Sequence, residues 1–142
     1  MADPGYGAEL FDLLRAMELP EGHYAVFGSG PLLVRGIIES VNDLDVICRG
    51  PAWDHACRLG TRVDLDDENI QIVSTHDGAV TFGRSWGYGS FDPTHLIDTA
   101  DMIDGLPFVQ IRHVIEYKRT AGRPKDLDHL ALIERHGDEG IR

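Results

Sequence analysis

The sequence predicts an α/β or α+β fold, in which a small mixed β-sheet is flanked by helices. Stretches with apolar residues at helical spacing alternate along the chain with short apolar runs that are typical of strands. No internal repeat, low-complexity segment or linker separates them. The 142 residues suit one domain with a core of useful size, so we expect a single domain over 1–142.

The expected helices have recognisable ends. Proline or glycine closes or opens most of them, and Asp92 before Pro93 is a helix start with a capping carboxylate. Gly137 is expected to end the last helix. The predicted helices span 8–18, 29–38, 52–59, a short stretch from Pro93, 110–120 and 125–136.

The expected strands lie between these helices and around two tight turns. His76-Asp77-Gly78 has the composition of a hairpin turn, and Asp104-Gly105 indicates another. The predicted strands span 23–27, 43–48, 69–74 and 79–83.

Composition limits the classes of function. The formal net charge is -11, and such a surface repels nucleic-acid backbones at long range, so non-specific binding to them is not expected. Cys48 lies in an apolar run, which favours a buried thiol over a disulfide. No apolar run approaches membrane-spanning length and no leader is recognisable, so we expect a cytoplasmic protein.

The expected strand over 43–48 carries two carboxylates on one face. Side chains alternate along a strand, so Asp43 and Asp45 project together, roughly 6–7 Å apart, while Leu44 and Val46 point into the core. Two like charges this close repel each other unless a cation lies between them. Oxygen ligands favour a hard divalent ion, so the pair predicts a site for Mg²⁺ or Mn²⁺.

A glycine–serine turn precedes this pair. Gly28 lets backbone approach a phosphate closely, and Ser29 with the following helical N–H groups can bind phosphate oxygens. Two other glycine-loop sites are excluded. The chain has no Gly-Lys-Ser/Thr, and Leu33 stands where a dinucleotide-binding motif requires glycine.

Two segments together resemble a known family. The pattern hydrophobic–Gly–Ser, spacer, Asp–hydrophobic–Asp over 26–47 resembles the nucleotidyltransferase fold related to DNA polymerase β. The segment 117–134 is similar to the Lys…Arg-x-Lys-Asp segment of small nucleotidyltransferases, which include abortive-infection type toxins. This resemblance implies that Lys118 contacts nucleotide phosphates. It assigns Arg123, Lys125 and Asp126 to the same site, whereas Asp128 falls one place short of the family's second Asp.

The sequence departs from the family at one point. The resemblance implies a third carboxylate on a neighbouring strand, yet neither 69–74 nor 79–83 contains an acid. Three explanations stay open: a base supplied by the substrate, an acid delivered from a loop, or a fold that binds without catalysis. The glycine-rich segment 83–90 suits either a loop over the site or a tight hairpin.

Other interpretations of the same residues are structural. Lys118 and Arg119 fit the end of a helix as exposed charges, where cations suit the dipole and contribute little to stability. Asp126 fits the first turn of the helix that Pro124 begins, where a negative charge is favourable. His55 and Cys57, two apart on a helix, do not make a zinc site.

The expected function is Mg-dependent transfer of a nucleotidyl group from an NTP to a hydroxyl of a small molecule, RNA or protein. Gly28, Ser29 and Lys118 would hold the nucleotide, while Asp43 and Asp45 would hold the metal. The alternative is a module of the same fold without catalysis, which binds a nucleotide or a protein partner and could be part of a toxin–antitoxin pair.

Overall fold

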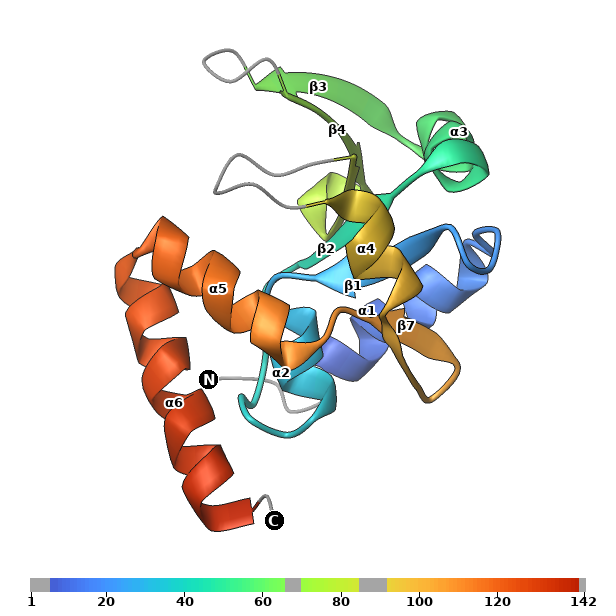
Figure 1. Cartoon of the computed structure of the whole chain (residues 1–142). Coiled ribbons are helices and arrows are strands. Elements are labelled where there is room, and N and C mark those ends of the chain that lie inside the picture. Colours follow the sequence, from blue (N-terminus) through green and yellow to red (C-terminus); the bar gives the residue numbers. More distant parts are fainter. Residues whose placement is uncertain (1–5, 66–69, 85–91, 141–142) are drawn as a thin grey trace.

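One seven-stranded mixed sheet organises the computed structural model, which describes residues 6–65, 70–84 and 92–140. The strand order is β3-β4-β5-β2-β1-β7-β6 (Figure 1). The pairs β2–β5 and β1–β7 are parallel, and the other neighbours are antiparallel. The strands are β1 (Tyr24–Phe27), β2 (Leu44–Cys48), β3 (Thr61–Leu65), β4 (Ile70–Thr75), β5 (Val80–Gly83), β6 (Asp101–Ile103) and β7 (Leu106–Phe108).

Helices accompany this sheet, so the predicted α/β (α+β) class is confirmed. The α5–α6 hairpin stands beside the sheet, next to α2 (Figure 1). Asp92 caps α4 as predicted, since its side chain accepts a hydrogen bond from the Thr94 amide. The helices are α1 (Tyr6–Ala16), α2 (Gly30–Val34), α3 (Gly50–Leu59), α4 (Pro93–Asp98), α5 (Ile111–Ala121) and α6 (Pro124–Gly140), with a 3₁₀ turn η1 (His76–Gly78).

The two central strands are buried over almost their whole length. Val26 and Phe27 of β1 and Leu44 and Val46 of β2 are at most 1% exposed. Burying side chains of this size stabilises a fold by about 1.5–3 kcal/mol each. This packing fixes the positions of the ends of β1 and β2. It therefore also fixes the positions of the polar residues next to those ends.

Three sequence predictions about the elements are wrong. Helix α2 ends at Val34 rather than near 38, because Gly36 adopts a φ of +77° and the Ile37 amide turns back to the Leu32 carbonyl, as in a Schellman motif. Helix α6 continues past Gly137, a glycine that a helix tolerates at a modest cost. Strand β3 was not expected, and it pairs with β4 as an edge strand with exposed side chains.

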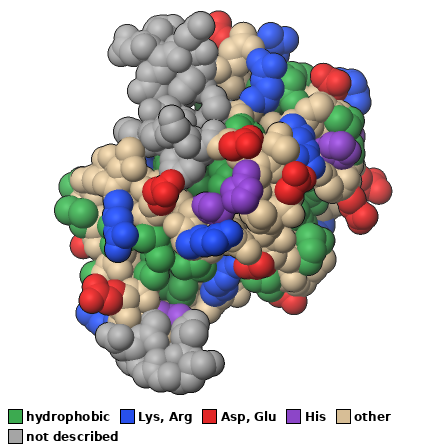
Figure 2. Space-filling view, in the orientation of Figure 1, with side chains coloured by type: hydrophobic (Ala, Val, Ile, Leu, Met, Phe, Trp, Pro, Cys, Tyr) green, Lys and Arg blue, Asp and Glu red, His purple; other side chains and the backbone are tan. Residues whose placement is uncertain are grey.

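The surface carries both signs of charge. On the face that Figure 2 shows, acidic and basic side chains are interspersed rather than gathered into one patch of either sign. Within the part of the chain that the structure describes, no helix has the length and apolarity needed to cross a membrane.

Candidate functional site

The candidate site lies where β1 ends and β2 begins. These strands are antiparallel, with Phe27 opposite Asp45, so the Gly28–Ser29 turn after β1 meets the first residues of β2. Helix α2 leaves from Gly30, which leaves Ser29 at its N-cap position. Ser29 makes no side-chain cap bond, however, so its hydroxyl is available for other contacts.

A polar pocket of about 240 Å³ opens at this edge of the sheet. It brings together residues that are up to about 100 positions apart in the sequence, and seven of the eight predicted site residues line it. The lining consists of Gly28, Ser29, Asp43, Asp45, Tyr117, Lys118, Arg123 and Lys125.

The sheet side of the pocket carries the two carboxylates. Asp43 is exposed just before β2, and Asp45 is half-buried on the strand. Burial, and next the negative charge of Asp43, raise the pKa of the Asp45 carboxyl above its ordinary value. The pair therefore carries unfavourable electrostatic energy that a cation between the carboxylates would relieve.

Gly28 matters for the placement of Asp45. Its φ of +67° lies in the left-handed region, which favours glycine. A Cβ atom at this position would lie 2.9 Å from Asp45 Oδ2. Glycine is thus required both by the backbone and by the space that the Asp45 carboxylate occupies.

The helix side of the pocket carries a buried ion pair. Lys118 on α5 is 1% exposed, so the prediction that it is an exposed side chain is wrong. Its Nζ donates to Ser29 Oγ at 3.1 Å and to Asp126 Oδ1 at 3.3 Å. Burial lowers the pKa of the Lys118 ammonium, while the adjacent Asp126 carboxylate opposes that shift.

Asp126 anchors this side from behind the pocket. It is 0% exposed and lies outside the pocket lining, next to the lining residues Lys118 and Arg123. Its carboxylate accepts hydrogen bonds from Arg123 through the backbone N–H at 3.2 Å, Nε at 2.6 Å and Nη2 at 3.2 Å. The backbone bond is the reciprocal half of a helix capping box, which is the structural role predicted for Asp126.

The electrostatics of Asp126 agree with this anchoring role. Burial alone would raise the pKa of the Asp126 carboxyl, but hydrogen bonds from Arg123 and the charge of Lys118 outweigh burial and lower it. The carboxylate thus stays ionised and holds both cations at the pocket wall.

Sequence reasoning missed three residues at the site: Tyr117, which lines the pocket, and Thr81 and His129, which contact lining residues. Thr81 stands beside Asp45 in the parallel β2–β5 pair, and its hydroxyl donates to Asp45 Oδ1 at 2.9 Å. The His129 Nδ1 atom lies 3.4 Å from Ser29 Oγ, and burial lowers the pKa of its imidazole. A threonine at strand spacing and a histidine one helical turn after Asp126 carry no motif, so only the fold reveals them.

The donor set fits a hard divalent cation that is bound together with a phosphate ligand. Among the residues that the structure describes, no three His, Cys, Asp or Glu side chains converge to hold a metal. Mg²⁺, however, is commonly bound by one or two carboxylates, with water and substrate phosphates completing its shell. Asp43 and Asp45 supply the two carboxylates. The neighbour of Asp45 on β5 is Thr81 and not an acid.

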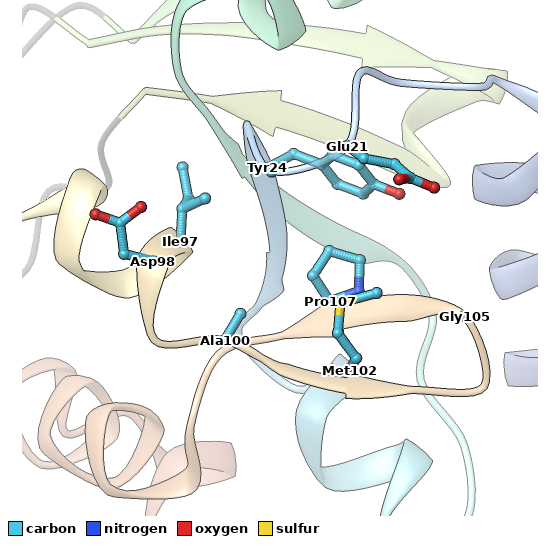
Figure 3. Close-up of a pocket in the computed structure, with 9 residues that line it drawn as sticks. Glu21, Tyr24, Ile97, Asp98, Ala100, Met102, Gly105 and Pro107 are labelled. Atoms are coloured by element: carbon cyan, nitrogen blue, oxygen red, sulfur yellow. The ribbon is translucent and has the colours of Figure 1, made fainter.

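The glycine-rich segment 83–90, for which a loop over the site and a tight hairpin were both open, falls mostly on 85–91, outside the described residues. A second pocket, of about 220 Å³, lies at the opposite end of β1 around Tyr24 (Figure 3). Its described lining includes the carboxylates of Glu21 and Asp98 but no lysine or arginine. That lining does not favour a phosphate ligand.

The sequence matches no protein-family model and no curated protein.

Proposed function

We propose that this protein is a nucleotidyltransferase-fold protein that binds a nucleoside triphosphate with Mg²⁺ or Mn²⁺ in the pocket between β2 and the α5–α6 hairpin. The observation that carries the proposal is the convergence of Gly28, Ser29, Asp43, Asp45, Lys118, Arg123 and Lys125 on one pocket. Their chemistry divides into a carboxylate side and a cationic side, as a metal–triphosphate ligand requires.

Each residue would act on a different part of the ligand. The backbone at Gly28, Ser29 and Gly30 would offer N–H groups to phosphate oxygens. Pro31 has no N–H, and the Leu32 N–H already donates to the Ser29 carbonyl. Arg123 and Lys125 face the same pocket and would offset phosphate charge. Lys118 would act chiefly through Ser29, whose Oγ it already contacts. Asp43 and Asp45 would hold the divalent ion, which would neutralise phosphate charge when bound.

The proposed reaction is transfer of a nucleotidyl group to a hydroxyl acceptor. The acceptor oxygen forms a bond to the α-phosphorus as the bond from that phosphorus to the bridging oxygen breaks, and pyrophosphate leaves. The acceptor proton goes to a base, and the described residues offer no carboxylate at the pocket besides Asp43 and Asp45.

A specific observation favours a second candidate, nucleotide binding without transfer. The family resemblance implies a third carboxylate on a neighbouring strand, yet β5, the strand whose Thr81 stands beside Asp45, contains no acid. A site with two carboxylates still suits a metal–nucleotide complex but lacks an obvious base.

Two measurements test the proposal. Calorimetric titration with each NTP should give binding that requires Mg²⁺ and is lost in Asp43→Asn/Asp45→Asn. Incubation with α-labelled NTP and Mg²⁺ should then transfer label to RNA, protein or a small hydroxyl acceptor. Binding without label transfer would favour the second candidate, and the absence of metal-dependent binding would exclude both.

A further inference from the structure

The side chain of Asp45 is fixed from two directions by residues outside the acidic pair. Thr81 Oγ1 lies 2.9 Å from Asp45 Oδ1. The other oxygen, Oδ2, lies against Gly28, as the 2.9 Å approach of a Cβ built on that glycine shows. Each oxygen therefore has a defined neighbour, one a hydroxyl donor and the other a backbone turn.

The Thr81 contact follows from the register of the sheet. Residues Leu44 to Ile47 of β2 pair in parallel with Val80 to Gly83 of β5, and Asp45 pairs with Thr81. Paired side chains on adjacent strands point to the same face, so the hydroxyl meets the carboxylate there. The same hydroxyl lies 3.4 Å from the Leu44 carbonyl, and its single proton is better placed for the closer carboxylate.

The Thr81 hydrogen bond is the closest described polar contact that acts on the Asp45 carboxylate, ahead of the charges of Lys125 and Arg123. The nearby Asp43 charge repels that carboxylate, and burial disfavours its ionised form. A donated hydrogen bond supports the ionised carboxylate and restricts its rotation. Groups that orient a ligating carboxylate in this way commonly change metal affinity about 10- to 100-fold when they are removed.

We propose that Thr81 is a positioning residue of the site: its hydroxyl holds the Asp45 carboxylate with Oδ2 toward the Gly28 turn and thereby raises the affinity of the site for a divalent cation. This inference rests on the proposed function, because it takes Asp45 as a metal ligand. Thr81 itself needs no contact with metal or nucleotide.

The test compares Mn²⁺ affinity, measured by electron paramagnetic resonance titration with Mn²⁺ alone, in wild type and threonine variants. Thr81→Val keeps the β-branched shape but removes the hydroxyl, and it should weaken Mn²⁺ binding about 10- to 100-fold. Thr81→Ser restores the hydroxyl and should bind within about threefold of wild type. Should Thr81→Val fold poorly by circular dichroism, Thr81→Ala serves in its place.

A matched control separates positioning from general damage to the sheet. Thr75 on β4 donates from its hydroxyl to the Val80 carbonyl at 2.7 Å and does not line the pocket. Thr75→Val should lower the thermal midpoint with Mn²⁺ affinity unchanged.

The outcomes distinguish failure of this inference from failure of the proposed function on which it rests. Wild-type affinity in Thr81→Val, or an equal loss in Thr81→Ser, would overturn the role of the hydroxyl while leaving the metal site in place. If Mn²⁺ bound wild type and Asp43→Asn/Asp45→Asn equally, both the inference and the proposed metal site would fail.

Discussion

The two sides of the pocket differ in how their buried charges are compensated. On the sheet side, Asp43 and Asp45 repel each other, and burial adds to the cost of ionising Asp45. On the helix side, the buried Lys118 and the half-buried Arg123 already share the carboxylate of Asp126. Under the proposed function, an external cation would compensate the charges of the sheet side, whereas the charges of the Lys118–Asp126–Arg123 cluster are compensated within the chain. Loss of a sheet-side charge should change the response to ligand, and loss of a charge from the cluster of Lys118, Arg123 and Asp126 should change stability.

The largest effect is expected from Asp126→Ala. The substitution leaves the Lys118 ammonium buried without its carboxylate, and breaking a buried ion pair from one side costs about 3–5 kcal/mol. Lys118→Ala should cost less, about 1–3 kcal/mol, because Asp126 keeps its hydrogen bonds from Arg123. Urea unfolding of both variants measures the difference.

Asp128→Ala provides the matched control, since Asp128 is an exposed acid two residues further along α6. It should change the free energy of unfolding by no more than about 0.5 kcal/mol. A loss in Asp126→Ala no larger than in Asp128→Ala would mean that the ion pair does not hold the helix side together.

The next effect is the response of the sheet side to metal. Mg²⁺ or Mn²⁺ should raise the thermal midpoint of wild type because the ion binds the native state preferentially, by about 2.7 kcal/mol at a hundred times its Kd. NaCl at matched ionic strength should not. Asp43→Asn/Asp45→Asn should lose the response and raise the metal-free midpoint, because the repulsion is gone. A retained response would place the bound ions elsewhere on this acidic surface.

A smaller effect separates the two reasons why position 28 requires glycine, the positive φ and the space that the Asp45 carboxylate occupies. Gly28→Ala and Gly22→Ala both place a Cβ on a backbone with positive φ, +67° and +81°, which costs about 1–2 kcal/mol. Only at Gly28 does the new Cβ meet the Asp45 carboxylate, whereas nothing lies within 4 Å of one at Gly22. Thermal melts with and without Mn²⁺ should therefore show the metal response lost in Gly28→Ala and kept in Gly22→Ala. Its survival in Gly28→Ala would show that Asp45 can move without losing the ion.

The contrast between the two sides also explains what the sequence could predict. Asp43, Asp45 and Gly28 lie within one local pattern of strand, turn, short helix and strand, so strand alternation and the chemistry of glycine were enough to single them out. The burial of Lys118 depends on how α5 packs against α6 and α2, whereas a lysine near a helix end is expected from sequence to be exposed.

For the same reason, site residues outside any motif could not be predicted from the sequence. Thr81 meets Asp45 only because β5 pairs with β2 in the sheet. In the chain, β3 and β4 lie between these two strands. Strand order is a long-range property of the sheet that local periodicity does not encode.

The smallest effect on stability is expected at Lys125, the exposed cation of the helix side. Lys125 lines the pocket without the burial of Lys118, so Lys125→Ala should change the free energy of unfolding by no more than about 0.5 kcal/mol. It should nevertheless weaken binding of Mg²⁺–NTP, because the ammonium acts on phosphate as a point charge, and Lys125→Arg should recover part of the affinity.

Arg119 on α5 is equally exposed but lies outside the pocket lining, so Arg119→Ala is the control for net charge. Calorimetric titration of NTP into the variants, at two salt concentrations, measures the loss of affinity and its dependence on salt. Equal losses in Lys125→Ala and Arg119→Ala that disappear at the higher salt would indicate diffuse attraction and would remove Lys125 from the site.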